Sequence, residues 1–253
     1  MIRQHKKMLV FTSVITLLPI LIGLLLWKQL PDSVAIHFGM DDQPDEYCSK
    51  AFAVFGLPVI LLLFHFICAV VTNMDPKAKN INKKVFQVVL WICPLVSVVV
   101  CDAIYVYSLG YKVNIEFLCG LFIGVLYLIL GNFIPKVKPN YSIGIRVPWA
   151  LCDPENWYHT HRFGGKCMVI GGIVLIVISP FQNARLFCIL VIIPCVLPII
   201  YSYLCIIENG FPDLTIYNGM KKRTCKVKNL TSPLVCYRKA FKDFFFILKC
   251  YPS

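Results

Sequence analysis

Six apolar runs, each about long enough to cross a lipid bilayer, limit what this chain can fold into. They cover residues 8–27, 51–71, 85–107, 115–134, 164–181 and 184–207. A hydrocarbon core of about 30 Å is crossed by roughly 20 helical residues. Backbone N–H and C=O groups find no water in that core, so each spanning segment has to satisfy them within a helix. The sequence therefore predicts an all-α integral membrane bundle of six transmembrane helices.

The composition excludes a soluble domain. Hydrophobic residues make up 58% of the chain and charged residues 15%, whereas soluble domains average about 45–50% and 25%. The first run follows Arg3, Lys6 and Lys7, as in a signal peptide. It is longer than a signal-peptide core, however, and no small-x-small cleavage site precedes Pro31, so we expect it to stay attached as an anchor.

The distribution of charge predicts the orientation. The connections 73–84 and 135–163 and the tail 208–253 are basic, whereas segment 28–50 holds five acidic residues and two lysines. Because Lys and Arg in short loops are retained in the cytoplasm, both termini are expected there. The net charge of +12 is then explained by attraction to anionic lipid headgroups. We expect membrane lipid, and no directly bound nucleic acid, as a partner.

Thirteen cysteines would suit a disulfide framework, but their positions favour another interpretation. Most lie inside the predicted spans, no Cys-x-x-Cys pair occurs, and only Cys48 clearly lies in an outer segment. We interpret the cysteines as small apolar side chains and expect no outer disulfide within one chain.

Three regions follow from this topology. Residues 8–72 form an N-terminal two-helix unit around the outer segment 28–50, and residues 85–207 form a four-helix region with a cytoplasmic loop at 132–163. Residues 208–253 form a basic cytoplasmic tail. In the outer segment, prolines and a glycine break any helix, and alternating apolar residues indicate extended backbone. We expect a folded cap there, built on Val34, Ile36 and Phe38.

Two ionisable residues lie within the apolar runs, His65 in the second and Asp102 in the third. Burying such a group in a membrane is costly, so each is a candidate for function. Both lie about two turns from a helix end, where interfacial water can reach them. A proton or ion relay is one interpretation, and a neutral imidazole bonded to a helix backbone is the alternative for His65.

The connection 131–166 is the most structured loop of the sequence. Asp153 followed by proline is typical of a helix start, with the carboxylate as the cap. On that helix Trp157 and His161 share a face, and Thr160 and Gly164 form a stripe on which another helix could rest. The glycines of the fifth run favour close packing as well.

Other side chains of this loop have several interpretations. Tyr141, Trp149 and Trp157 fit the headgroup level as amphipathic aromatic residues. The planar guanidinium of Arg146 suits carboxylates, carbonyls or lipid phosphate. His159 and His161 point to different faces of a helix and have no third ligand at a suitable spacing, so no metal or other cofactor is expected. No motif pairs a nucleophile with a base, so we expect no catalytic residue and no enzyme.

The stretch GNFIPKVKPNYSIGIRVPWALCDPENWYHTHRFGGK resembles the signature of the SdpI family, bacterial immunity proteins against a secreted peptide toxin. Its matching positions are Asn132, Pro135, Asn140, Gly144, Ile145, Arg146, Pro148, Trp149, Trp157, Thr160, His161, Arg162 and Gly164. The outer segment is similar to a domain of unknown function often joined to this family. It matches at Leu30, Pro31, His37, Pro44, Asp45 and Lys50. Val147 departs from the family, which commonly has threonine there, and the tail is an addition.

The resemblance implies a multi-pass protein of the bacterial plasma membrane that protects the cell from a toxin named for Bacillus sporulation delaying protein. The best-known member is thought to bind toxin and then hold a small winged-helix repressor at the membrane. A peptide toxin on the outer face is thus the expected partner, and such a repressor on the cytoplasmic face is a further candidate partner. Arg146, His161 and Arg162 are the expected functional core. The alternative is a small-molecule or ion transporter that uses Asp102 and His65.

Overall fold

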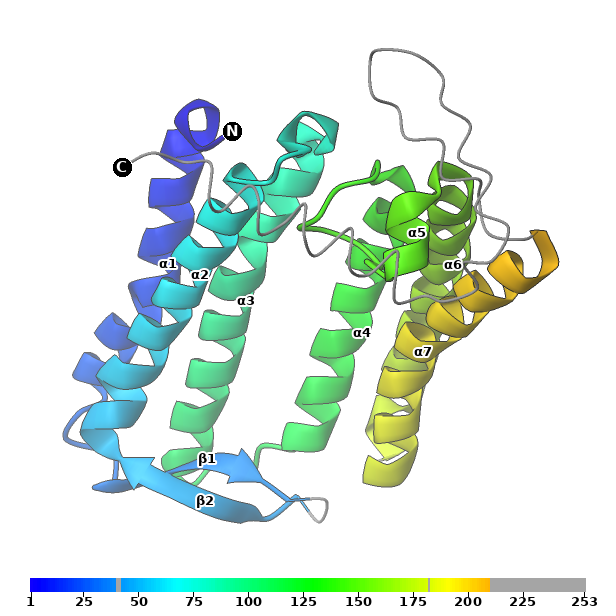
Figure 1. Ribbon diagram of the computed structural model, residues 1–253. Helices are drawn as coiled ribbons and strands as arrows, with labels where there is room; N and C mark the ends of the chain where they lie inside the picture. The colour runs from blue at the N-terminus through cyan, green and yellow to red at the C-terminus, as the bar shows by residue number, and fades with distance from the viewer. Residues whose placement is uncertain (40–41, 182, 210–253) are drawn as a thin grey trace.

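The computed structural model describes residues 1–39, 42–181 and 183–209. Six helices in this part of the chain are long and apolar enough to cross a membrane, as predicted. They are built on α1 (Lys6–Leu25), α2 (Leu57–Asn73), α3 (Lys83–Ser108), α4 (Ile115–Phe133), α6 (Pro154–Ile178) and α7 (Ala184–Asn209) (Figure 1). The expected tail begins at the end of α7, and its residues 210–253 lie outside the described residues.

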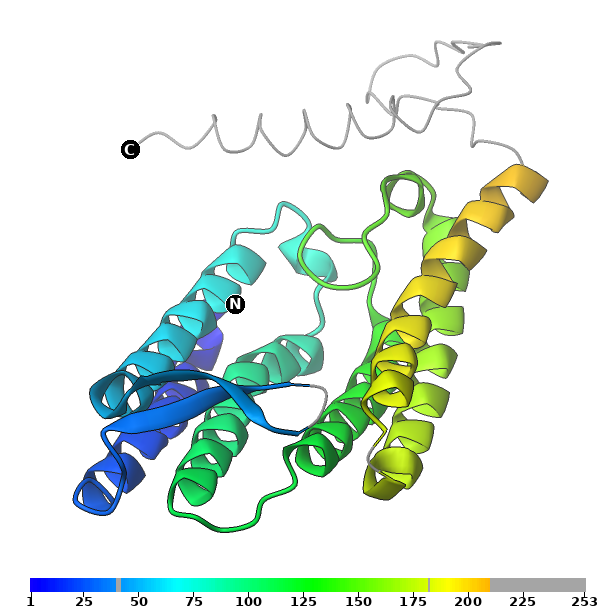
Figure 2. The ribbon, with the colours of Figure 1, turned by 90° about the horizontal axis from the view of Figure 1, so that it is seen from below.

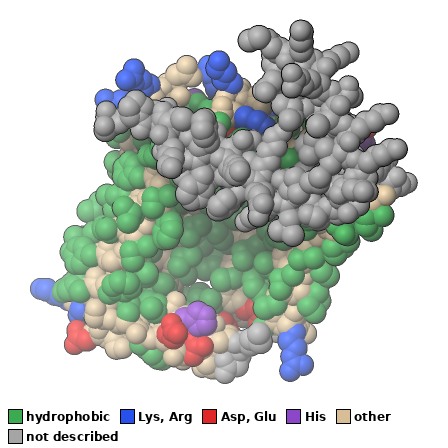
Figure 3. Space-filling model, in the orientation of Figure 1, with side chains coloured by type: hydrophobic (Ala, Val, Ile, Leu, Met, Phe, Trp, Pro, Cys, Tyr) green, Lys and Arg blue, Asp and Glu red, His purple; other side chains and the backbone are tan. Residues whose placement is uncertain are grey.

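The helices show apolar side chains on their outer surface. Leu63 on α2 and Ile170 on α6 are each 62% exposed. Figure 3 shows apolar side chains over the middle of the molecule and charged side chains at both ends, with Lys and Arg at the top and acidic side chains together with some Lys or Arg at the bottom. A surface of this kind is stable against lipid and not against water. The chain is a multi-pass membrane protein.

The helices pack in two groups of three. Helices α1 and α2 pack on α3, whereas α4 and α7 pack on α6. Helices α3 and α4 follow each other in the chain but barely touch (Figure 1). Packing alone does not define a functional unit, so the division into residues 8–72 and 85–207 stays a prediction.

Glycines bring α4 and α6 into backbone contact, which confirms the close packing expected of the fifth run. A Cβ atom added at Gly165 would lie 2.7 Å from the Gly131 carbonyl oxygen. One added at Gly172 would lie 2.6 Å from the Gly124 carbonyl oxygen. Real side chains do not fit these distances, so the two helices touch only because all four positions lack one.

The outer segment forms a β-hairpin, which confirms the predicted extended backbone. Strand β1 (Ser33–Phe38) pairs antiparallel with β2 (Pro44–Ser49). The hairpin runs across the ends of the first helix group (Figure 2). Its residue Val34, on β1, is fully buried. Residues 52–56 then form a π-helical turn, η2 (Phe52–Gly56), which leads into α2.

The structure corrects the start of the fifth span. It begins at Pro154 rather than at residue 164, because α6 is one continuous helix that includes the second half of the expected loop. Asp153 caps it as predicted, with its carboxylate accepting from the Glu155 N–H. Polar residues of the first turns, Asn156 and His161, are buried by protein rather than exposed to lipid. Their polarity hid this part of the helix from a search for apolar runs.

The loop that remains is short. Between η4 (Ile134–Lys136) and α5 (Pro148–Cys152) lie residues 137–147, without a helix or strand. They lie at the end of the bundle opposite the hairpin (Figure 1). We call these two ends the loop end and the hairpin end.

Candidate functional site

A buried carboxylate joins the two helix groups at the loop end. Asp75, in the α2–α3 connection, is 6% exposed. Its Oδ2 accepts from the Tyr141 N–H at 2.8 Å and from the Ser142 hydroxyl at 2.6 Å, and its Oδ1 accepts from the Lys77 N–H at 2.7 Å. Asn80 of the same connection donates to the Pro139 carbonyl at 2.7 Å. We call these contacts the loop clasp.

Asn140 shapes the loop from within. Its Nδ2 donates to the carbonyls of Lys138 and Ile143, and its Oδ1 accepts from the N–H groups of Ser142 and Ile143. The side chain is fully buried. This amide satisfies the polar groups of a turn that has no helix or sheet of its own.

His161 is fixed at the centre of the motif by both of its ring nitrogens. Nε2 accepts from the Ile145 N–H at 3.0 Å, so Nδ1 carries the proton and donates to the Trp157 carbonyl at 2.8 Å. The imidazole is stacked on the Trp157 ring, with centroids 4.0 Å apart. Gly144 has a φ of +113° and presses against Nε2, where a Cβ would collide. The ring is therefore neutral and has no nitrogen left to act as a base.

Trp157 is enclosed by protein. It is 2% exposed, and its indole N–H donates to the Val137 carbonyl at 2.9 Å. The expectation that Trp157 anchors the helix at the headgroup level is therefore wrong. Val137 belongs to the loop 137–147, so the Trp157 ring fastens this loop to α6.

Sequence reasoning missed a second polar cluster, which joins α5, α6 and α7. Asn156 Nδ2 donates to the Ser202 carbonyl at 2.9 Å, and the Ser202 hydroxyl donates to Asn156 Oδ1 at 2.6 Å. Trp149 donates to the Ser202 hydroxyl at 3.0 Å, and Thr160 donates to Asn156 Oδ1 at 3.0 Å. Ser202, a polar residue deep within an apolar run, is a signal that could have revealed this cluster. Asp75 was missed as well. It is followed by proline, as Asp153 is, and this shared pattern is a signal that could have drawn attention to it.

The remaining motif residues lie around these clusters. Pro148 is the first residue of α5. Gly164 faces Ile145 and Pro198, and a Cβ there would lie 3.2 Å from Pro198. Arg146 is exposed, and its guanidinium donates to the Tyr141 carbonyl at 2.7 Å.

The last three motif residues lie apart from His161, on a groove between the end of α4 and α6. Asn132, Pro135 and Arg162 line it together with Lys136 and Lys166. Its volume is about 440 Å³. We call it the basic groove.

The three outer residues singled out in the sequence form ion pairs at the hairpin end. His37 Nδ1 lies 2.6 Å from Asp45 Oδ1 across the hairpin. The hydrogen bond to this carboxylate, and then its charge, raise the pKa of His37 above its ordinary value of 6.5. Lys50 lies 2.9 Å from Asp32 Oδ1 and also donates to the Leu30 carbonyl. These residues hold the hairpin and lie far from the loop motif.

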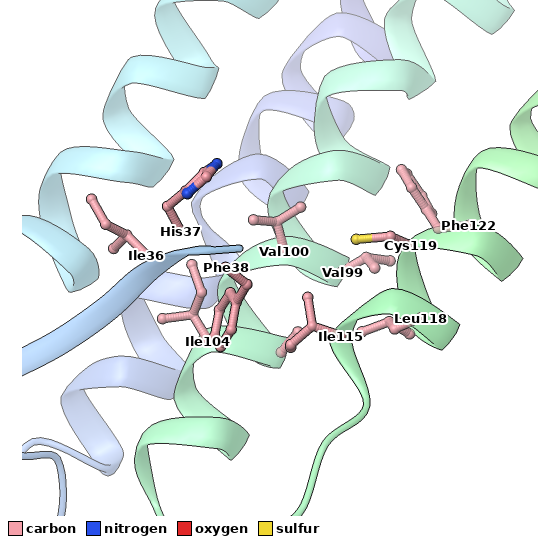
Figure 4. A pocket seen from close by; sticks show the side chains of 11 residues that line it. Ile36, His37, Phe38, Val99, Val100, Ile104, Ile115, Leu118, Cys119 and Phe122 are labelled. Atoms are coloured by element: carbon pink, nitrogen blue, oxygen red, sulfur yellow. The ribbon is translucent and has the colours of Figure 1, made fainter. Parts of the chain in front are cut away.

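A cavity of about 310 Å³ lies between the hairpin, α3 and α4. Its lining is almost wholly apolar, with the side chain of His37 on its hairpin side (Figure 4). The lining residues are Ile36, His37, Phe38, Val99, Val100, Ala103, Ile104, Ile115, Leu118, Cys119 and Phe122. We call it the hairpin cavity. It opens where the two helix groups separate, which no pattern in the sequence indicates.

Two contacts fasten the hairpin to the two helix groups. Asp42, beside the tip of the hairpin, accepts from the Glu116 N–H of α4 at 3.2 Å. The ring of Phe38 meets the edge of Tyr107 on α3 at 4.8 Å. The hairpin therefore bridges both helix groups, as the loop clasp does at the other end.

The two ionisable residues of the spans are not connected. His65 Nε2 lies 3.1 Å from the Thr12 hydroxyl of α1. Asp102 lies six residues before the end of α3 at Ser108, near the hairpin end. Its buried Oδ1 has no hydrogen-bond partner within the described part of the chain. No ion pair joins the two residues among those the structure describes.

The described residues contain no group of three His, Cys, Asp or Glu side chains that could hold a metal ion. His159 is exposed and lies 4.0 Å from Glu155, whereas His161 is buried on the other face of α6. The two histidines therefore point apart, as their spacing predicts.

Comparison with known proteins identifies two segments. Residues 136–202 match the SdpI/YfhL protein family, and residues 14–62 match a domain of unknown function, DUF1648. The chain is also 27% identical over 191 residues to the protein "Immunity protein SdpI" of Bacillus subtilis (strain 168), covering 73% of this chain and 87% of that relative. No solved structure matches.

Proposed function

Because the resemblance to the SdpI family is confirmed by both segments and by the relative in Bacillus subtilis, we propose that this chain is a membrane immunity protein. It protects the cell that carries it against a secreted peptide toxin. The protein binds the toxin rather than altering it, since His161 has no free nitrogen with which to act as a base. The loop end faces the cytoplasm, because the basic connections lie there.

The hairpin cavity carries this proposal. It lies at the hairpin end, which faces the outside in the expected orientation, where a secreted peptide arrives. Its apolar walls suit the apolar side chains of a membrane-active peptide, at a volume of about 310 Å³. The acidic residues of segment 28–50, among them Asp45 and Glu46, would attract a cationic peptide to its mouth.

A survival assay tests this function. The chain is expressed in cells killed by the Bacillus sporulation delaying toxin, and survival is compared with cells that carry the empty vector. We expect protection by the unchanged protein and its loss in Ala103→Phe, which fills the cavity. Val59→Phe, on the exposed face of α2, is the matched control and should protect fully. Equal killing with and without the protein would refute the immunity function.

An additional role in signalling to a winged-helix repressor fits the exposed loop end. Arg146 projects from a loop that the clasp connects to both helix groups. A peptide wedged between α3 and α4 would change their separation and so move this loop. A fluorescent repressor should then gather at the membrane only when toxin is present, and Arg146→Gln should prevent this. Recruitment that is independent of toxin would contradict the role.

Transport is the second candidate, favoured by two buried atoms without a hydrogen-bond partner among the described residues, Oδ1 of Asp102 and Nδ1 of His65. A relay would need a path from Asp102 to His65, which pairs instead with Thr12. Proteoliposomes distinguish the two functions. Solute or ion flux that disappears in Asp102→Asn would favour a transporter, whereas immunity predicts survival that is unchanged by the same substitution.

A further inference from the structure

The basic groove is a site that the immunity function leaves unused. One wall is formed by Asn132 at the end of α4 and Lys136 of η4, and the other by the face of α6 that bears Arg162 and Lys166. Arg162 and Lys166 are four residues apart and therefore lie one above the other on α6. The groove forms because the missing side chain of Gly165 lets α6 contact the end of α4.

Three cations meet in this groove without a counter-ion. Lys136, Arg162 and Lys166 are all exposed, and within the described residues none of them forms an ion pair. Among the residues that the structure describes, no Asp or Glu side chain lines the groove. Three positive charges held together in this way repel one another, and an anion bound between them would offset this repulsion.

Neighbouring groups hold two of the three cations in place. Lys136 donates to Asn132 Oδ1 at 3.2 Å. Arg162 donates to the Tyr158 hydroxyl, and its guanidinium lies over that ring at 5.3 Å. An arginine has five N–H donors and a lysine three, so most donors remain for a ligand. Lys166 keeps all three of its N–H donors, because it forms no hydrogen bond with the described residues.

The groove changes from charged to apolar along α6. Toward the middle of the membrane span its lining continues with Val169 and Ile170, and Ile170 is 62% exposed. The charged part lies at the loop end, at the level of the headgroups. A ligand that fills both parts has an anionic head and an apolar chain in the same order as a lipid of that leaflet.

We propose that the basic groove binds the phosphate of an anionic phospholipid, with the start of one acyl chain lying on Val169 and Ile170. Lys136, Arg162 and Lys166 donate to the phosphate oxygens. Free phosphate shares the chemistry of the head, but it leaves the apolar part of the groove empty. The lipid would brace the contact between α4 and α6.

Native mass spectrometry tests this site on the full chain, purified in detergent with equal amounts of phosphatidylglycerol and phosphatidylcholine. We expect the unchanged protein to retain phosphatidylglycerol selectively. Each cation near an anionic lipid is expected to contribute about fivefold in affinity. The change Lys136→Gln with Arg162→Gln and Lys166→Gln should therefore reduce retention roughly a hundredfold.

The matched control removes the same charge at the same end but outside the groove, as Lys79→Gln with Lys83→Gln and Lys84→Gln. It should keep the selectivity for phosphatidylglycerol. Lys166→Gln alone, which removes no contact within the described residues, should reduce retention about fivefold without affecting folding. Equal losses in the groove variant and the control variant would overturn the proposal.

Inorganic phosphate, added in large excess, separates the two sources of the anion. A bound lipid gains from its acyl chain, so phosphate should fail to displace it. Complete displacement by inorganic phosphate would show a site for a free anion and would overturn the assignment to lipid.

Discussion

Gly144 and His161 depend on each other. Gly144 has a φ of +113°, a backbone conformation that residues with a side chain rarely adopt. A Cβ added there would lie closest to Nε2 of His161. That nitrogen is already held by the Ile145 N–H. The imidazole of His161 thus joins α6 to the loop through Ile145.

Gly144→Ala should therefore lower the free energy of unfolding by about 1–3 kcal/mol. Thermal unfolding in detergent measures the change. Gly110→Ala is the matched control, because Gly110 also has a positive φ, of +86°, but has no atom within 4 Å of the added Cβ. The difference between the two variants reports the collision with His161. Equal midpoints for both variants would show that His161 yields without cost.

His37 makes the hairpin sensitive to pH. Its pKa is raised in the folded protein by the hydrogen bond from its ring to Asp45, so protonation and the folded hairpin favour each other. The stabilisation is fully present below the ordinary value of 6.5 and is lost as the pH rises through the higher folded value. The effect belongs to the pH range just above 6.5.

Histidine NMR of the protein in nanodiscs measures this directly, with His37→Gln used to assign the signal. The midpoint for His37 should lie above 6.5 and should fall toward that value in Asp45→Asn. Glu46→Gln, a neighbouring acidic residue that makes only a smaller contribution, should shift the midpoint less. A midpoint unaffected by Asp45→Asn would mean that the pair is open in solution.

Helices α4 and α6 depend on the absence of side chains where they meet. The backbone of Gly165 lies so close to Gly131 that an added Cβ would be 2.7 Å from its carbonyl oxygen. Gly165→Val should therefore force the helices apart and cost about 1–3 kcal/mol of unfolding free energy. Ile173→Phe, which enlarges a half-exposed side chain on the same helix, should cost little. Equal melting temperatures for the two variants would contradict this account of the contact.

The sequence was sufficient to predict elements with a clear period or length. Apolar runs predicted the spans, alternation at Val34, Ile36 and Phe38 predicted β1, and Asp153 predicted the start of a helix. The first turns of α6 were not predicted as part of a span, because they are polar. Their polar side chains are bonded to other protein groups rather than facing lipid, as Asn156 is to Ser202. Such partners are distant in the sequence and leave no local pattern.

The functional region was harder to predict than the fold. The motif residues lie within one stretch of the chain. In the structure they are divided among the loop, the polar cluster of Asn156 and the basic groove. The hairpin cavity is lined from three elements that come together only in the folded protein. Composition could predict that its walls are apolar, but not that α3 and α4 separate to form it.

The protein as a whole is two helix groups joined at both ends, by the loop clasp and by the hairpin, with the hairpin cavity between them. Between these two connections, α3 and α4 make few contacts with each other.

Photo-crosslinking tests most directly whether toxin binds in the hairpin cavity. Benzoylphenylalanine replaces Phe122 in the cavity or, as a control, Phe64 on the exposed face of α2. The Bacillus sporulation delaying toxin is then added to intact cells, and the sample is irradiated. We predict a toxin adduct at position 122 and none at position 64. Cells that survive without an adduct at 122, or equal adducts at both positions, would contradict the account.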